Sequence, residues 1–182
     1  MSKIETNTID TVSGTTNLTI GSTNSSTVTF ENGSCTGHMY PAFLATRTTT
    51  QSIPNNAYTK VQFDTEVFDT DSCYDNSTNY RFTPTVAGKY FVTAQAGFEN
   101  FNNTNHRVIW NIYKNGSPYS LVGDMALSTD AGADPTLIVS TIVEMNGSSD
   151  YIELFAYQNS GGSVNIKGVD TQVKFHAFRI GS

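Results

Sequence analysis

The chain has 182 residues and a net charge of −6 at neutral pH; only 14% of its residues are charged, while Ser, Thr and Asn make up 61 of them. Its acidity and its lack of a Lys/Arg cluster argue against a nucleic-acid-binding surface, and no apolar run approaches the length needed for insertion in a membrane. Ser, Thr and Asn disfavour helices because their side chains compete for backbone hydrogen bonds. The composition therefore favours an all-β protein.

The first 37 residues differ in composition from the rest. Short β-branched patches alternate there with Ser-Gly, Gly-Ser and Asn-Gly turn signals, and aromatic residues are nearly absent. One interpretation is a flexible Ser/Thr-rich linker. We favour an extended, β-rich N-terminal arm that becomes ordered in an assembly and attaches the protein to a particle, because apolar residues recur regularly along it. These candidate attachment residues are Ile9, Val12, Leu18, Ile20, Val28 and Phe30. The predicted organisation is an arm over residues 1–37 and a head over residues 38–182.

The head shows the alternation of β-strands. Residues 88–98 place apolar side chains at every second position, and residues 106–114 and 137–143 do the same. Residues 151–157 carry apolar groups on both faces, which is typical of a strand covered on both sides, here by a neighbouring subunit. A last strand is expected over residues 172–180. We predict eight to ten strands, no amphipathic helix, and a β-sandwich or jelly roll.

One segment of the head carries a family signature. Residues 80–92 read Tyr-Arg-Phe-Thr-Pro-Thr-Val-Ala-Gly-Lys-Tyr-Phe-Val. They resemble the Phe-x-x-Pro-x-x-Gly-x-Tyr-x-Phe motif of C1q-like domains, with Pro84 one position earlier than in the motif and Val92 where an aromatic residue is commoner. Pro84 is expected to fix a turn. Gly88 is expected to allow a close turn before the next strand, which Tyr90 begins with its ring pointing inward.

The resemblance covers about residues 39–182 and implies a jelly roll of the C1q and tumour-necrosis-factor type, assembled as a homotrimer. The chain has no collagen Gly-X-Y stalk; its first 37 residues instead resemble the Thr/Ser/Asn/Gly-rich segments of bacteriophage fibre proteins. Trimer formation is expected to cover rings that a lone sandwich leaves exposed, such as Phe91, Phe101 and Phe178. The aromatic residues assigned to the trimer interface or the core are Phe82, Tyr90, Phe91, Phe155, Tyr157, Phe175 and Phe178.

Candidate sites for small ligands are few. Asp69, Asp71 and Asp75 imitate the start of a calcium-binding loop, but the Gly and the closing Glu of an EF-hand are missing. Calcium and a solvated acidic loop are the two interpretations, and no other cofactor is expected. Cys35 and Cys73 match no zinc or redox spacing, which leaves one disulfide or, more in keeping with a reducing cytosol, two free thiols.

The sequence shows no catalytic motif: it lacks a nucleophile elbow, a phosphate-binding loop and a zinc-protease motif. Tyr119, Tyr157 and an exposed side of Trp110 are candidates for stacking on a glycan, although packing in the core or at the trimer interface is the favoured explanation for each. The three histidines, His38, His106 and His176, show no metal-ligand spacing.

The function that these observations favour is that of a non-enzymatic phage structural protein on the virion surface. It would be a homotrimeric fibre or capsid-decoration protein that binds other virion proteins through its arm. The alternative is a tail-fibre module that recognises a glycan on the host cell surface. An enzyme acting on surface polysaccharide is the third hypothesis, and no motif supports it.

Overall fold

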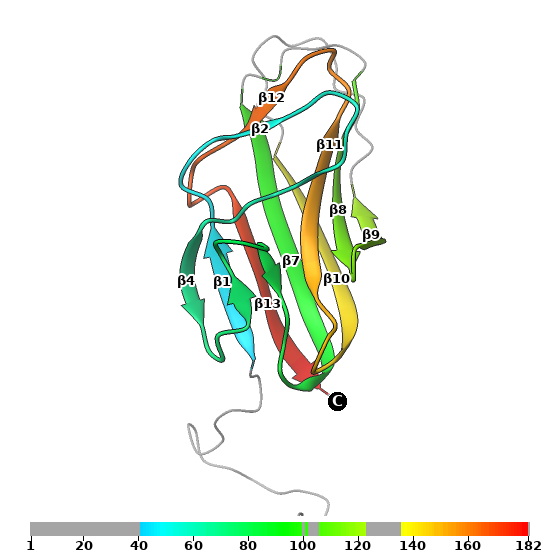
Figure 1. Ribbon diagram of the computed structural model, residues 1–182. Helices are drawn as coiled ribbons and strands as arrows, with labels where there is room; N and C mark the ends of the chain where they lie inside the picture. Colours follow the sequence, from blue (N-terminus) through cyan, green and yellow to red (C-terminus); the bar gives the residue numbers. More distant parts are fainter. Residues whose placement is uncertain (1–40, 100, 102–105, 123–135, 182) are drawn as a thin grey trace, which may run out of the picture. The chain divides into compact units, whose positions relative to one another are not determined.

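The computed structural model describes residues 41–99, 101, 106–122 and 136–181 (Figure 1). All regular elements in these residues are β-strands, so the predicted all-β class is confirmed. No helix of the described chain could cross a membrane. The predicted arm, its attachment residues, Cys35 and His38 lie outside the described residues, and the predicted boundary after residue 37 stays a prediction.

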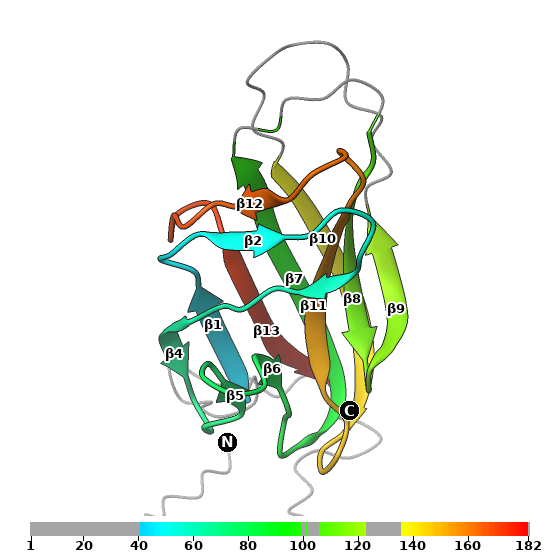
Figure 2. The same ribbon diagram turned by 45° about the horizontal axis from the view of Figure 1, so that its top comes forward.

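The strand β7 (Ala87–Glu99) is the centre of a seven-stranded antiparallel sheet. It pairs with β10 (Thr136–Asn146) on one side and with β13 (Lys174–Gly181) on the other. From β13 the sheet continues through β1 (Ala42–Thr46) to β4 (Thr65–Asp69). Two short strands extend this sheet at the C-terminal end of β7, as Figure 2 shows. They are β12 (Val164–Ile166) and β2 (Gln51–Ile53).

A second antiparallel sheet of six strands packs over the first and completes the sandwich. Its order is β5, β6, β11, β8 and β9, and β3 also pairs with β11. The bounds are β3 (Thr59–Lys60), β5 (Tyr74–Asp75), β6 (Arg81–Phe82), β8 (Val108–Lys114), β9 (Ser117–Val122) and β11 (Ile152–Gln158). The described residues thus hold more strands than predicted, because elements of two or three residues are too short to show a periodicity.

The core lies between the two sheets and is rich in aromatic rings. The alternating residues of β7, from Tyr90 to Phe98, are all buried there, as the sequence pattern predicted. Phe43 stacks on Tyr74 and Phe82 at centroid distances of 4.7 and 4.5 Å. The prediction that a lone sandwich leaves Phe101 exposed is wrong: its ring is 2% exposed and packs 5.6 Å from Phe98.

Phe82, Gly88 and Tyr90 of the C1q-like motif each have a physical explanation in the structure. Phe82 and Tyr90 are in the core, and the Tyr90 hydroxyl donates a hydrogen bond to the Val86 carbonyl at 2.7 Å. Gly88 has a φ of 145°, and a Cβ atom there would lie 2.3 Å from the backbone oxygen of Gly181. Only glycine therefore allows β13 to approach the start of β7 this closely.

Replacing Gly88 with alanine should destabilise the head by about 2 to 3 kcal/mol, since the new methyl group meets backbone and a strained φ together. Urea unfolding followed by Trp110 fluorescence measures the effect. Gly162→Ala is the matched control, because nothing lies within 4 Å of a Cβ atom at that position. Equal unfolding midpoints for the two variants would contradict the proposed role of Gly88.

Candidate functional site

The outward side of the seven-stranded sheet carries several large apolar side chains. Phe91 on β7 pairs with Phe178 on β13 and with Ile142 on β10, so three large apolar side chains form one row. In the next row across the sheet, Leu44 lies on β1 between Phe68 on β4 and His176 on β13. Phe68 is 46% exposed and Ile142 is 52% exposed, although the core of the lone head is already complete without them.

Two apolar surfaces follow from this arrangement. The apolar face lies on β1, β4, β7 and β13 and consists of Leu44, Val67, Phe68, Phe91, Phe178 and Ile180. The apolar edge lies on β9 and β10 and consists of Tyr119, Leu121, Ile138 and Ile142. Seven of the ten exposed large hydrophobic side chains in the described residues belong to these two surfaces. Contiguous exposure on this scale is typical of an interaction surface.

The apolar face contains two depressions that side chains of a partner could fill. One hollow of about 280 Å³ is lined by Leu44, Phe68, His176 and Phe178 among others. A second hollow of about 280 Å³ lies beside it and is lined by residues that include Val67 and Lys174. A protruding apolar side chain of a second chain would fit such depressions.

His176 lies in the first of these hollows, on the outward side of β13. Its Nδ1 atom is buried and has no hydrogen-bond partner. Burial, and then the positive charge of Lys174, lower the pKa of His176 below its ordinary value. The imidazole therefore favours its neutral form more than a free histidine does, in a hollow lined by Lys174 and by apolar side chains.

The structure divides the predicted aromatic residues among three places. Phe82, Tyr90 and Phe175 are fully buried in the core. Phe91 and Phe178 belong to the apolar face, with centroids 5.6 Å apart. Phe155 and Tyr157 lie on the outer side of the six-stranded sheet. There, rings of the same chain pack against them, in the place where the sequence predicted a neighbouring subunit.

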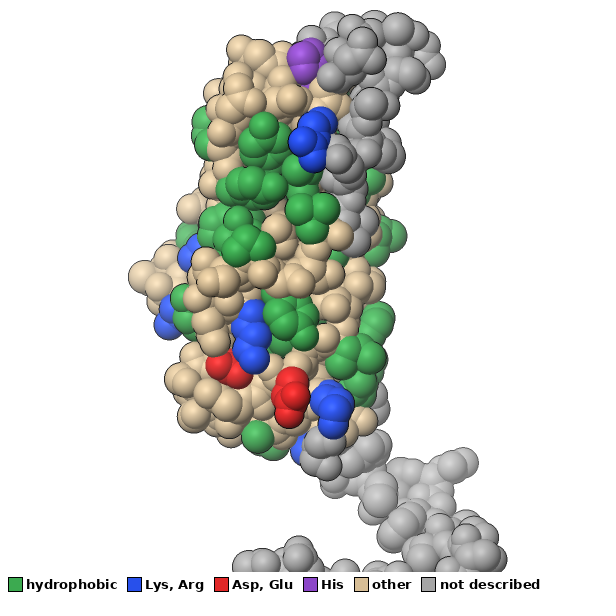
Figure 3. Space-filling view, turned by 90° about the vertical axis from the view of Figure 1, so that its right-hand side faces the viewer, with side chains coloured by type: hydrophobic (Ala, Val, Ile, Leu, Met, Phe, Trp, Pro, Cys, Tyr) green, Lys and Arg blue, Asp and Glu red, His purple; other side chains and the backbone are tan. Residues whose placement is uncertain are grey.

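Two of the predicted glycan-stacking residues are elsewhere. Trp110 has no exposed side: it is 1% exposed and stacks on Phe98 in the core at 5.0 Å. Tyr119 is on the apolar edge, where its hydroxyl donates a hydrogen bond to the Ile142 carbonyl at 3.2 Å. Tyr157 remains on an outer face. Figure 3 shows hydrophobic side chains gathered on the side of the head where β8, β9 and β11 lie.

The acidic segment forms a hydrogen-bonded turn. Asp75 accepts hydrogen bonds from the backbone N–H groups of residues 77–79, and these bonds lower its pKa. Asp69 accepts one from the Tyr74 N–H at 2.6 Å, and Asp71 accepts one from the Thr85 hydroxyl. In the described ranges, no group of three or more His, Cys, Asp or Glu is arranged to hold a metal ion. The calcium site stays a prediction without structural support.

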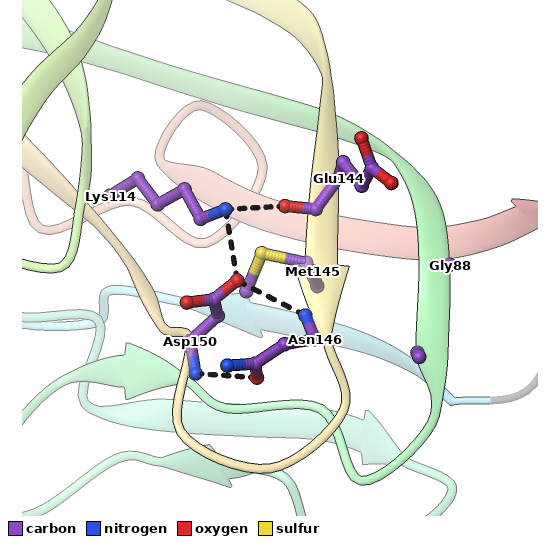
Figure 4. A pocket seen from close by; sticks show the side chains of 7 residues that line it. Gly88, Lys114, Glu144, Met145, Asn146 and Asp150 are labelled. Atoms are coloured by element: carbon purple, nitrogen blue, oxygen red, sulfur yellow. Dashed lines mark hydrogen bonds and ion pairs between the residues drawn. The ribbon is translucent and has the colours of Figure 1, made fainter.

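Other charged side chains serve the fold. A hollow of about 450 Å³ near the turn after β10 contains Lys114, whose Nζ atom pairs with Asp150 at 2.9 Å and donates to the Glu144 carbonyl (Figure 4). Arg47 is buried and donates to the carbonyls of Thr50 and Gln62. Cys73 is buried as a free thiol, and burial raises its pKa. These groups are already paired or shielded, and they offer no reactive centre.

Comparison with known proteins identifies the fold. No family model matches the sequence, and no curated protein does. Among solved structures, murine APRIL matches with a TM-score of 0.59 and 9% identity over 77% of this chain and 98% of its own. Vertex protein P5 of PRD1 matches with a TM-score of 0.54 and 18% identity over 79% of this chain and 99% of its own. Eiger TNF from S. frugiperda matches with a TM-score of 0.52 and 8% identity, over 79% and 94%. The predicted jelly roll of the C1q and tumour-necrosis-factor type is confirmed.

The environment of His176 predicts a loss of stability in mild acid. Because its pKa is lowered in the folded state, the unfolded chain takes up the proton first as the pH falls. The contribution of neutral His176 to the free energy of unfolding is thus fully present above about pH 6.5, and it declines as the pH falls below that value. The lowered pKa values of Asp75 and Asp150, due first to hydrogen bonds from the Thr78 N–H and the Asn115 amide, act only below about pH 4.

Thermal unfolding between pH 7.5 and pH 5.5 measures this effect. The melting temperature of the native chain should fall across this window, and that of His176→Gln, which cannot titrate, should fall less. Parallel curves for the two proteins would show that His176 does not control the response.

Proposed function

We propose that this protein is a non-enzymatic structural protein of a bacteriophage virion. It assembles as a homotrimeric fibre or capsid-decoration protein on the virion surface, with residues 1–37 attached to other virion proteins and the head projecting outward. The observation that carries the proposal is the pair of exposed apolar surfaces on the head. A fold that this chain shares with a phage vertex protein supports the virion setting.

The apolar face and the apolar edge favour the assembly of protomers into a closed ring. The apolar face and the apolar edge consist of different side chains on different strands, and they adjoin where Ile142 lies opposite Phe91. A contact that places the edge of one protomer on the face of the next is heterologous, and a heterologous contact generates a closed ring when its rotation closes. Three protomers are the number that the C1q-like resemblance implies. The hollows beside Leu44 and Phe68 would then receive side chains from the edge of the neighbouring protomer.

Native mass measurement tests the assembly. The full chain should have the mass of three 19.8 kDa chains. Phe68→Glu and Ile142→Glu should each give folded monomers, because burial of an unpaired carboxylate costs several kcal/mol. Val86→Glu is the control, since Val86 is also exposed but lies outside both surfaces. A native chain that stays monomeric at all concentrations would refute the trimer.

The same measurement with a chelator tests the calcium interpretation of Asp69, Asp71 and Asp75. These carboxylates already accept hydrogen bonds from the chain, so we expect EDTA to leave the native mass unchanged. Dissociation of the trimer by EDTA, reversed by added calcium, would restore the metal site.

Deletion of residues 1–37 tests the attachment. The truncated head should still form trimers, because both apolar surfaces belong to later residues, but it should no longer sediment with virus particles. The full-length protein is the positive control. Continued sedimentation of the truncated head with particles would show that the head itself contains the anchor.

A further inference from the structure

Four aromatic rings form a continuous surface on the outer side of the six-stranded sheet. We call it the tyrosine platform; its residues are Tyr58, Tyr113, Phe155 and Tyr157. Tyr113 and Phe155 are stacked with centroids 4.1 Å apart. Tyr58 lies 5.0 Å from Tyr157 and 6.3 Å from Tyr113, and it is 43% exposed. The strands β8 and β11 and the residue before β3 supply the rings.

Several polar groups of this surface have no partner. The hydroxyls of Tyr58 and Tyr113 make no hydrogen bond to any described residue, whereas the Tyr157 hydroxyl donates to Asn56 Oδ1 at 3.1 Å. Asn111 is 3% exposed, and its Oδ1 atom is buried without a donor. A buried oxygen left without a donor is costly and calls for an explanation.

Asn111 belongs to the same side of the sheet as the platform. Its neighbours Trp110 and Ile112 point into the core, so the alternation of β8 places Asn111 on the outer side. In the register between β8 and β11 it lies directly opposite Phe155. Asn111 is therefore a neighbour of the platform in the sheet, covered from solvent.

Lys60 and Glu153, two described charged residues beside the platform, pair with each other. Lys60 has its Nζ atom 6.0 Å from the centroid of Phe155. That ammonium is paired with the carboxylate of Glu153 and donates to the Asn79 carbonyl at 3.0 Å. A cation and an anion that neutralise each other give no net attraction for a charged ligand.

We propose that the tyrosine platform is a binding site for a neutral oligosaccharide. Flat rings cover the C–H faces of pyranose units, and phenol hydroxyls match the many hydroxyls of a sugar. An aliphatic groove, which an apolar peptide would need, is not what these four residues form. The site goes beyond the proposed virion assembly. It lies on the opposite side of the sandwich from the apolar face. Leu121 of the apolar edge lies opposite Asn111 in the register of β8 with β9, so the platform borders the edge contact of the proposed ring.

Calorimetric titration of the full chain with neutral hexasaccharides tests the site. The probes are cellohexaose, mannohexaose and chitohexaose, and a sulfated heparin hexasaccharide is the anionic comparison. At least one neutral probe should bind, and the anionic one should not. Tyr58→Ala and Tyr157→Ala should each weaken binding about tenfold, the effect of losing one stacking ring at about 1.4 kcal/mol.

Tyr151→Ala is the matched control and should bind like the native chain. Tyr151 directly precedes β11, but its ring is covered by the Arg81 guanidinium at 4.3 Å, apart from the platform. Tyr58→Phe keeps the ring and removes the hydroxyl, so it should retain most of the stacking contribution.

Three results would overturn the proposal: no binding of any neutral probe, equal binding by Tyr58→Ala and the native chain, or preference for the anionic probe. Native mass is recorded for every variant. A monomeric chain that still binds a neutral hexasaccharide would refute only the trimer, and a trimer that binds none would refute only the platform.

Discussion

The close approach between β7 and β13 at Gly88 is the constraint on which the rest of the head depends. β7 is the only described strand that pairs along its length with both β10 and β13, so its register fixes the position of every outward side chain on that sheet. A shift by one residue would exchange Tyr90 in the core with Phe91 on the surface. The core and the apolar face are therefore two consequences of one register.

The sequence correctly predicted which residues of a long strand face the core and which face outward, because these positions alternate with a period of two residues. Residues 88–98 were correctly divided into core and surface positions, because every second residue is apolar. Phe101 was misjudged since it follows the alternating run, and no periodicity describes its fold back onto Phe98. Trp110 was placed correctly in an inward set, and its supposed exposed side disappears because Phe98 stacks on it.

The surfaces were harder to predict than the core. The exposure of Phe68, Ile138 and Ile142 had no local signal, because each stands next to another apolar residue in the sequence. They become part of a patch only when β4, β1, β13, β7 and β10 lie side by side. The tyrosine platform was missed for the same reason. Tyr58 and Tyr113 are 55 positions apart in the numbering, and only the pairing of β11 with both β3 and β8 brings their rings together.

The first and last strands of the head lie side by side in opposite directions, with Ala42 opposite Phe178. The chain therefore enters and leaves the sandwich at one end, while the turn that links β11 to β12 lies toward the other (Figure 1). This arrangement is suited to fusion proteins, because a reporter fused at the C-terminus would project from the same end of the sandwich at which β1 begins. It is equally suited to circular permutation, because a short linker could join the two ends and new termini could be opened elsewhere.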